Sequence, residues 1–297
     1  MRPSREQLDN LTPLERASFE LANLMAHKRL TVLSKAYLSV VMGSMIWSCG
    51  GRRLNVRGLS NLAPFGKDAR VLIVANHKSF FDFFLITALL FWRTKLSKRV
   101  FFPVRSTFFY DNPVGPLVNL TMSGMRMFPP VMRDDKKRQF NQWSVDRLCD
   151  ELRHPGTVVA IHPEGTRNKS DDPYAFLPAQ PGAGRVALSV PEAVVIPVFV
   201  LGMGNALHEE FAANWTSPSA HPIDVYFGAP VDLSDLRGQA PRAALFKRAS
   251  DRCMDAIRAL ANEHRQGLGL PPLAPPSRRS RPSAAPESET DAPPALV

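Results

Sequence analysis

Cysteine is scarce in this chain of 297 residues. Its three cysteines, Cys49, Cys149 and Cys253, lie far apart in the sequence, and none belongs to a Cys-x-x-Cys pair. An odd and scattered set of this kind argues against a disulfide framework and against a thiolate metal site, and it fits a reducing compartment. The seven histidines include no pair at the spacing of metal ligands on one helix. We therefore expect no metal.

Long hydrophobic runs are also missing. No secretory signal opens the chain, because charged residues are frequent where such a signal has its apolar core. Residues 31–49 hold one charge, Lys35, but serines and Gly43 leave this stretch short and weakly apolar for a membrane span. Leucines at helical spacing precede it, so we predict an N-terminal helical segment, residues 1–50, that lies on a membrane surface. The alternative is a helix that covers the core of the domain.

Acidic residues are fewer than basic ones, 27 against 37, which gives a formal net charge of +10 at pH 7. This charge favours anionic partners such as nucleic acid, phosphorylated ligands or an anionic lipid surface. A basic protein that binds nucleic acid or anionic membrane is one alternative, supported by the basic stretch at residues 277–281. The aromatic residues, however, cluster in apolar pairs such as Phe80-Phe81, whereas stacking platforms alternate them with basic residues. We therefore expect no nucleic-acid partner.

Apolar residues become rare near the C-terminus. Residues 271–297 consist mainly of proline, serine, alanine and charged side chains, a composition that buries too little surface to offset the entropy of ordering. We predict a disordered tail over 271–297. Residues 51–270 remain for one catalytic domain, a usual size for an α/β fold.

Short apolar runs alternate with helical patterns along residues 51–270. This rhythm is typical of strands joined by helices, and we predict an α/β fold with a mixed central sheet flanked by helices. An irregular span rich in proline and glycine is expected from Asn112 to Gly124. The expected strands lie near residues 54–56, 71–75, 100–104, 157–161, 193–200 and 223–227, and the expected helices near 13–47, 80–91, 136–152, 182–189 and 241–264.

A histidine and an aspartate follow the expected strand 71–75. Since ligands bind at the carboxyl ends of strands in α/β sheets, both residues are candidates for the site. His77 and Asp82 can touch only if His77 precedes the helix, and Ser79, as helix cap with Asp82 three residues on, permits this. Asp82 would then orient the imidazole of His77, which would act as general base on a hydroxyl. The alternative is an ordinary loop histidine beside a capping aspartate.

A second polar box, His162-Pro163-Glu164-Gly165-Thr166-Arg167, follows the strand 157–161. Pro163 and Gly165 indicate a turn, while Thr166 and Arg167 offer a hydroxyl and a guanidinium suited to phosphate oxygens. Glu164 would repel an anion, so it is expected to orient the loop or to contact a hydroxyl. Backbone amides near Gly165 are candidates to stabilise an oxyanion. The alternative is a surface turn with a solvated arginine.

Together the two boxes resemble those of the glycerolipid and lysophospholipid acyltransferase family, which share this order and spacing. The resemblance implies transfer of a fatty acyl group from acyl-CoA or an acyl carrier protein (acyl-ACP) to the free hydroxyl of 1-acylglycerol 3-phosphate. Another lyso-lipid, such as a lyso-ornithine lipid or a lysophospholipid, is the alternative acceptor. The resemblance implies no cofactor beyond the acyl co-substrate, and attachment to the cytoplasmic face of a membrane. Direct attack on the thioester is expected, because no activated serine or cysteine is evident.

Two further motifs of the family are matched less well. The last one, an apolar strand around a proline, is similar to residues 194–198, for which a plain buried strand is the alternative. The family's middle motif is similar to Gly124 through Arg133, which makes Arg133 the candidate ligand of the acceptor phosphate, with Arg126 and Arg105 as alternatives. Gln180 stands where the family usually has a lysine. One phosphate contact is therefore either lost or supplied by Arg185.

Overall fold

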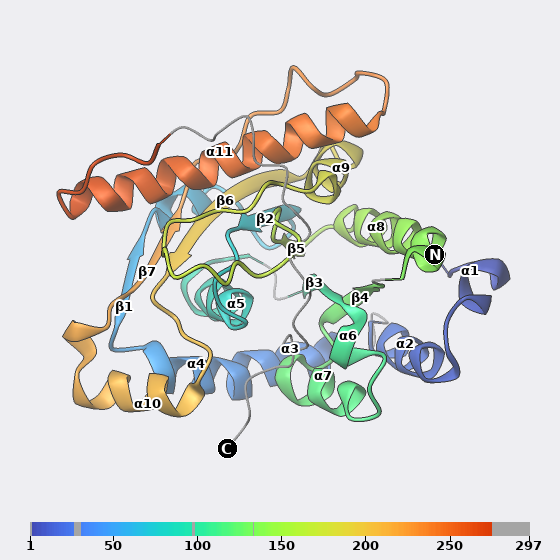
Figure 1. Ribbon diagram of the computed structural model, residues 1–297, viewed down its shortest axis with the longest axis horizontal. Helices are drawn as coiled ribbons and strands as arrows, with labels where there is room; N and C mark the ends of the chain where they lie inside the picture. Colours follow the sequence, from blue (N-terminus) through green and yellow to red (C-terminus); the bar gives the residue numbers. More distant parts are fainter. Residues whose placement is uncertain (1, 27–30, 97–98, 133, 275–297) are drawn as a thin grey trace.

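A mixed sheet of seven strands runs through the protein, whose computed structural model describes residues 2–26, 31–96, 99–132 and 134–274 (Figure 1). The strands lie in the order β1-β7-β6-β2-β5-β3-β4. The last five of these are parallel, β7 is antiparallel to β6, and β1 is parallel to β7. The prediction of an α/β fold with a mixed central sheet is confirmed. The strands are β1 (Leu54–Arg57), β2 (Val71–Ala75), β3 (Arg99–Arg105), β4 (Met127–Val131), β5 (Thr157–Ile161), β6 (Val194–Leu201) and β7 (Ile223–Phe227).

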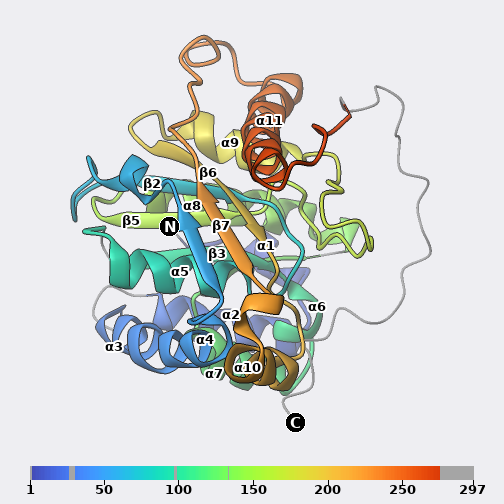
Figure 2. The ribbon, with the colours of Figure 1, turned by 90° about the vertical axis from the view of Figure 1, so that its left-hand side faces the viewer.

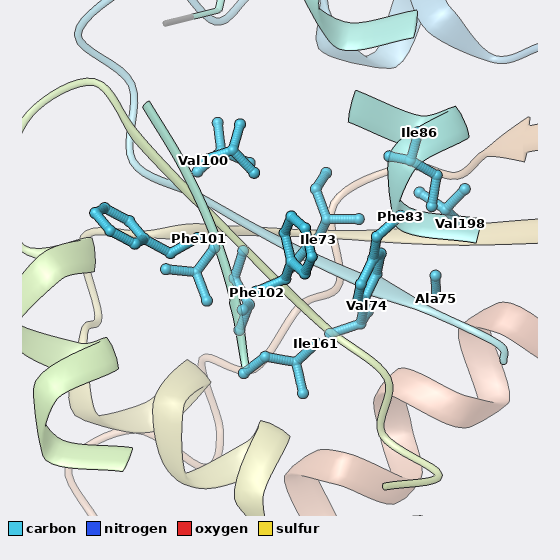
Figure 3. Packing of buried hydrophobic residues seen from close by; sticks show 14 of the residues in the cluster. Ile73, Val74, Ala75, Phe83, Ile86, Val100, Phe101, Phe102, Ile161 and Val198 are labelled. Carbon is cyan, nitrogen blue, oxygen red and sulfur yellow. The ribbon is translucent and has the colours of Figure 1, made fainter. Parts of the chain in front are cut away.

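Helices cover both faces of this sheet, and the central strands are accordingly buried on both sides. Every residue of β2 and β5 is buried, the pattern that parallel strands adopt between two helical layers. Figure 3 shows part of this packing: Ile73 of β2 lies on the side of α5, and Ile161 of β5, which is in register with Val74, lies on the other side of the strands. The covering helices are α8 (Arg138–Leu152), α9 (Pro181–Ser189) and α11 (Ala243–Gly267) on one face and α5 (Asp82–Arg93) on the other (Figure 1).

The N-terminal segment packs below α5 and contributes to the core. It comprises α1 (Arg5–Asp9), α2 (Pro13–Met25), α3 (Thr31–Tyr37), a π-helical turn η1 (Leu38–Met42) and α4 (Gly43–Gly50). Leu38, Met42 and Ile46 recur at helical spacing and are buried in the same cluster as the sheet. Burial of each such side chain stabilises the fold by about 1.5–3 kcal/mol. One side of the stretch 31–49 therefore covers the core, as expected for the alternative of a core-covering helix.

The opposite side of the same stretch is exposed and apolar. Leu33 is 63% exposed, Val40 65% and Trp47 45%. Within the described residues, no helix has both the length and the hydrophobicity that a membrane span requires. Attachment of this segment to a membrane surface stays a prediction.

Four regions differ from the sequence-based expectations, and one of them is the strand β4 (Met127–Val131), which was not predicted. The span Asn112–Gly124 contains a helix, α7 (Gly115–Ser123). Its proline and glycine are compatible with this helix, because Pro116 lies in the first turn, where proline is tolerated, and Gly124 ends the helix in the left-handed conformation. Two other helices were not predicted, α6 (Ser106–Phe109) and α10 (Leu207–Thr216). Proline and glycine mark the two ends of α7, so the prediction of an irregular span over residues 112–124 was wrong.

The start of the predicted tail lies against α11. The Leu273 N–H donates to Asn262 Oδ1 at 2.8 Å, and Arg265 Nε donates to the carbonyl of Pro271 at 2.7 Å. Residues 271–274 therefore fold back along the last turns of α11. The remainder of the predicted tail, 275–297, lies outside the described residues.

Candidate active site

The two polar boxes meet because their strands are neighbours in the sheet. β2 and β5 pair in parallel, with Val74 opposite Ile161, so the loops after them leave the same edge side by side. The His77 N–H donates to Glu164 Oε1 at 2.9 Å, and the Asn168 N–H donates to the carbonyl of His77 at 2.8 Å. Residues almost ninety positions apart in the chain thus form one continuous surface.

His77 and Asp82 contact each other through Nδ1 and Oδ2, which lie 3.3 Å apart. The same carboxylate oxygen accepts the backbone N–H groups of Lys78 and Ser79, both at 2.9 Å. Asp82 is buried, and burial raises the pKa of its carboxyl to about 6 despite these hydrogen bonds. An acceptor on Nδ1 favours the tautomer that leaves Nε2 of His77 able to take a proton.

The helix after His77 begins later than the sequence predicts. Phe81 occupies the cap position of α5 and makes no side-chain cap bond. Ser79 is not the cap, because its hydroxyl donates to the carbonyl of Gly204 at 2.9 Å and accepts the N–H of Phe81 at 3.1 Å. Asp82 still reaches back to the N–H of Ser79, and this bond keeps His77 in the loop ahead of the helix.

His162 lies against His77, a relationship that the sequence does not reveal. The two imidazole rings stack with centroids 3.8 Å apart and an interplanar angle of 2°. On its other side His162 stacks on Phe83 at 3.6 Å. The Nδ1 of His162 is 3.0 Å from the carbonyl oxygen of Ala75, to which its N–H donates. Burial, followed by the neighbouring His77, lowers the pKa of His162 well below its ordinary value.

Among the described residues, His77, Asp82 and His162 bring possible metal-ligand atoms within 4.8 Å of one another. A shared ion is a poor fit, because ring nitrogens bind metals in the plane of the ring and these two rings are parallel. Nδ1 of His162 is already bonded to a carbonyl, and the Asp82 oxygen already accepts two N–H groups.

Glu164 holds the second box in place. Its Oε1 accepts the N–H of His77, and its Oε2 accepts the N–H of Leu177 at 2.7 Å. Burial raises the pKa of its carboxyl to about 7. Of the two roles expected for Glu164, orientation of the loops is the one that these bonds describe.

Gly165 shapes the turn but its amide is engaged. Its φ is +70°, which favours glycine, and an added Cβ would lie 2.9 Å from the side chain of Gln180. The Gly165 N–H donates to the carbonyl of His162 at 3.0 Å. The Gly165 amide is thus engaged within the turn, and the role of the amides near it as oxyanion donors stays a prediction. Thr166 and Arg167 follow Gly165, and both line the cavity described next.

A cavity of about 600 Å³ opens beside His77. β3 and β5 pair only over Arg99–Phe101 and Thr157–Val159, and the cavity lies where the strands separate beyond these residues. Its polar rim includes His77, Arg105, Thr166 and Arg167. The apolar lining comes from β3, β4, β5 and helices α5, α8 and α9, and includes Phe83, Phe102, Val131, Val145, Leu148, Ile161 and Val186, of which Phe83, Phe102 and Ile161 appear in Figure 3.

The candidate arginines for phosphate binding lie at different places in the structure. Arg133 lies outside the described residues. Arg126 precedes β4 and is buried, so it lies at the sheet edge opposite His77. Arg105 ends β3 and lines the cavity. Arg185 forms an ion pair with Asp146 of α8 and is not among the cavity-lining residues.

A family model described as Acyltransferase matches residues 53–201. The chain belongs to the acyltransferase family. The matched segment runs from the start of β1 to the end of β6 and contains both polar boxes, which confirms the resemblance to glycerolipid acyltransferases. A search of the curated proteins finds no match.

Asn205 is a second residue of this acyltransferase site that the sequence did not indicate. It follows β6, the other neighbour of β2, and its Oδ1 accepts the N–H of Phe80 at 2.8 Å and an N–H of Arg167 at 3.2 Å. It therefore ties Arg167 to the loop that carries His77. His162 had one usable signal, since it directly follows a strand. Asn205 had none, because its loop matches no motif.

Proposed function

We propose that the protein transfers a fatty acyl group from acyl-CoA or acyl-ACP to the free hydroxyl of 1-acylglycerol 3-phosphate. One observation carries the proposal: the His77–Asp82 pair stands at the rim of an apolar cavity, with Arg105 and Arg167 on the same rim. An acyl chain, a hydroxyl and a phosphate are the three groups that such a site would hold together. Membership of the acyltransferase family supplies the reaction class.

His77 is the general base of this reaction. The acceptor hydroxyl oxygen attacks the thioester carbonyl carbon while Nε2 of His77 removes the hydroxyl proton. The C–S bond then breaks, and the proton passes from His77 to the departing thiolate. Asp82 keeps its carboxylate on Nδ1 and stabilises the imidazolium that forms between these steps.

The cavity would hold the acyl chain, and the arginines the phosphate. A volume of about 600 Å³ falls within the roughly 300–1,000 Å³ typical of small-ligand sites. Arg167 presents its guanidinium from a position fixed by Asn205, and Arg105 enters the same rim from β3. Arg133 remains a candidate for the acceptor phosphate. Another lyso-lipid, such as a lyso-ornithine lipid or a lysophospholipid, is the alternative acceptor, because these contacts would recognise any acidic headgroup.

We also propose that the enzyme works on the cytoplasmic face of a membrane, attached by a broad apolar side. Helices α3, α4, α7 and α10 lie along one side of the molecule in both views (Figures 1 and 2). Two contacts fix α10 to α4 and to the turn after it: Asn214 Nδ2 donates to the carbonyl of Ser48 in α4 at 2.8 Å, and Arg53 in the turn pairs with Glu210 at 2.7 Å. The exposed apolar residues of these helices, of η1 between α3 and α4 and of the cap of α7 are Leu33, Val40, Val41, Trp47, Val114, Leu117, Leu120, Phe211 and Trp215.

This side has the composition of a membrane interface. Trp47 and Trp215 are half-exposed on it, and tryptophan is enriched where apolar chains meet headgroups. A platform of this kind would bring the cavity to an acceptor that never leaves the bilayer. The apolar side also favours this proposal over a role in nucleic-acid binding, because an exposed apolar surface does not bind a polyanion.

Release of thiol from an acyl thioester is the test. Purified protein would receive acyl-CoA or acyl-ACP with 1-acylglycerol 3-phosphate, a lysophospholipid or a lyso-ornithine lipid, and the lipid products would be identified. We expect thiol release that depends on acceptor and is greatest with 1-acylglycerol 3-phosphate. Greatest turnover with another lyso-lipid would select the alternative acceptor. If folded protein bound to vesicles transferred no acyl group to any of these three acceptors, the proposal would be wrong.

A further inference from the structure

The rings of His77, His162 and Phe83 form a stack of three at the rim of the cavity. The first pair has centroids 3.8 Å apart and is parallel within 2°, and the second pair has centroids 3.6 Å apart and is parallel within 12°. Each ring comes from a different element: the loop after β2, the loop after β5 and α5. The stack therefore fixes the plane of the His77 ring from outside its own loop.

Asp82 alone does not fix that plane. One hydrogen bond to Nδ1 sets the direction of an N–H but lets the ring rotate about the line between Nδ1 and the oxygen. A flat neighbour in van der Waals contact removes this freedom, because rotation would drive one edge of the imidazole into the ring beneath. The Nδ1 of His162 donates to the carbonyl of Ala75, so the neighbour is itself held.

The charge state of His162 suits this role. Two imidazoles in face-to-face contact repel each other if both are protonated. The pKa of His162 is held well below its ordinary value, mainly by burial, so its ring is neutral when His77 gains a proton. A neutral aromatic face also attracts a cation placed over it.

We propose that His162 is a positioning residue for the base: its flat ring, clamped between Phe83 and His77, holds the imidazole of His77 in the plane that aims Nε2 at the acceptor hydroxyl. This inference rests on the proposed role of His77 as base. It assigns to His162 a function that depends on the flatness of its ring rather than on its nitrogens.

Two variants of similar volume separate flatness from the other properties of His162. His162→Phe and His162→Leu both remove the ring nitrogens and the bond to Ala75, but only phenylalanine retains a flat face. We expect kcat of His162→Leu to lie at least about tenfold below that of His162→Phe, since displacement of a reacting group by about 1 Å can lower a rate about 10²-fold. Acceptor KM should differ little between the two variants. Thermal unfolding and circular dichroism would confirm that both fold.

The same two substitutions in a His77→Ala background provide the control for a purely structural role. If His162 acts through His77, Phe and Leu at position 162 should give equal residual activity once His77 is gone. Equal activity of the two single variants would show that flatness is irrelevant and would overturn the proposal. A tenfold difference that persists without His77 would overturn it as well, because the effect would then come from packing alone.

Nitrogen NMR of the His77 ring tests the stack without substrate. In nitrogen relaxation measurements, the His77 ring should be rigid in the wild-type protein and in His162→Phe, whereas it should be more mobile in His162→Leu. Equal mobility of the ring in the two variants would count against the clamp. This readout stays valid if none of the acceptors proves to be a substrate, so failure of the proposed function and failure of the clamp are distinguishable.

Discussion

Asp82 Oδ2 lies 3.3 Å from Nδ1 of His77 and also accepts the backbone N–H groups of Lys78 and Ser79. The loop that carries His77, the proposed base, thus surrounds the carboxylate of Asp82. This carboxylate lies in a buried position at the start of α5, where the helix dipole favours a negative charge. A single oxygen therefore shapes the loop and sets the tautomer of the base.

Replacement of His77 with alanine should lower kcat by about 10²–10⁴, the usual contribution of a general base. The fold should survive, because the ring is partly exposed and the bonds of the loop to Asp82 and Glu164 use backbone groups of residues 77–79. Thiol release with saturating acceptor measures the effect. Near-normal turnover in a preparation free of wild-type protein would rule out this mechanism.

Asp82→Asn should raise stability while it abolishes activity. The folded protein raises the pKa of Asp82 from 3.8 to about 6, so ionisation of this carboxyl destabilises the fold as pH rises through that window. A pKa difference of about 2 corresponds to about 3 kcal/mol of destabilisation. This destabilisation is fully present above the pKa of Asp82 in the folded protein and is absent well below its pKa in the unfolded chain. Asparagine removes the charge and keeps an oxygen for the two N–H groups. Unfolding by urea at pH 8 and at pH 4 measures the difference.

The expected signature is a gain in unfolding free energy at pH 8 that is mostly lost at pH 4. Asp68→Asn is the matched control, because Asp68 is exposed and its carboxylate is already in water. Loss of stability in Asp82→Asn at pH 8 would mean that the hydrogen bonds of the carboxylate outweigh its burial. Activity of the wild-type protein should fall as pH drops through about 6, where the His77–Asp82 pair gains a proton.

Much of the fold could be predicted because its central strands are buried on both faces. Such strands read as unbroken β-branched runs, and β2, β5 and β6 lie within one residue of where their runs predict them. Helix α8 was predicted to within two residues at its start, from the spacing of its apolar side chains. α7 and α10 were missed because the glycines and prolines that bound them resemble loop signals.

The site was predictable only in part, because neighbours in a sheet are not neighbours in sequence. Both boxes could be located at strand ends, but the stacking of His162 on His77 depends on β5 pairing directly with β2. Asn205 reaches Arg167 because β6 lies on the other side of β2. The choice between Arg105 and Arg126 likewise depends on which end of a strand each occupies, and spacing alone does not give this.

Arg167→Ala should raise the acceptor KM about 10- to 100-fold with a smaller change in kcat, since a hydrogen bond to a charged group contributes about 1.5–3 kcal/mol. Asn205→Ala should raise KM less, because the guanidinium remains but loses its fixed position. Initial rates over a range of 1-acylglycerol 3-phosphate concentrations measure both. Arg153→Ala, at the far end of α8, is the control and should leave KM unchanged.

The two other candidate phosphate ligands can be ranked in the same assay. We expect Arg105→Ala to raise the acceptor KM, because Arg105 lines the cavity beside His77. Arg133→Ala tests the middle motif directly. An unchanged KM in Arg133→Ala together with a raised KM in Arg105→Ala would reassign the phosphate contact to Arg105.

Val145→Phe should shift the preferred acyl chain to a shorter length. Val145 lines the apolar cavity from α8 and is only partly buried, so a larger side chain can occupy the cavity without displacing the core. Each methylene group of the acyl chain that the cavity can no longer hold lowers the binding free energy by about 0.8 kcal/mol. Competition among acyl-CoA substrates of increasing length gives the profile, with Val56→Phe on the distant strand β1 as control. An unchanged profile would mean that the chain lies elsewhere.

Attachment to membranes should depend on both parts of the apolar side, the N-terminal segment and α10. We expect the wild-type protein to sediment with anionic phospholipid vesicles, to stay bound at high salt and to be released by detergent, because apolar burial is not screened by ions. Val40→Ser combined with Phe211→Ser should weaken vesicle binding at least tenfold, since burial of each side chain contributes about 1.5–3 kcal/mol. Leu268→Ser with Leu270→Ser is the matched control: these leucines are comparably exposed, but they lie just beyond α11, away from that side. Equal loss of binding in the two double variants would show that general surface hydrophobicity, and not this side of the molecule, drives the attachment.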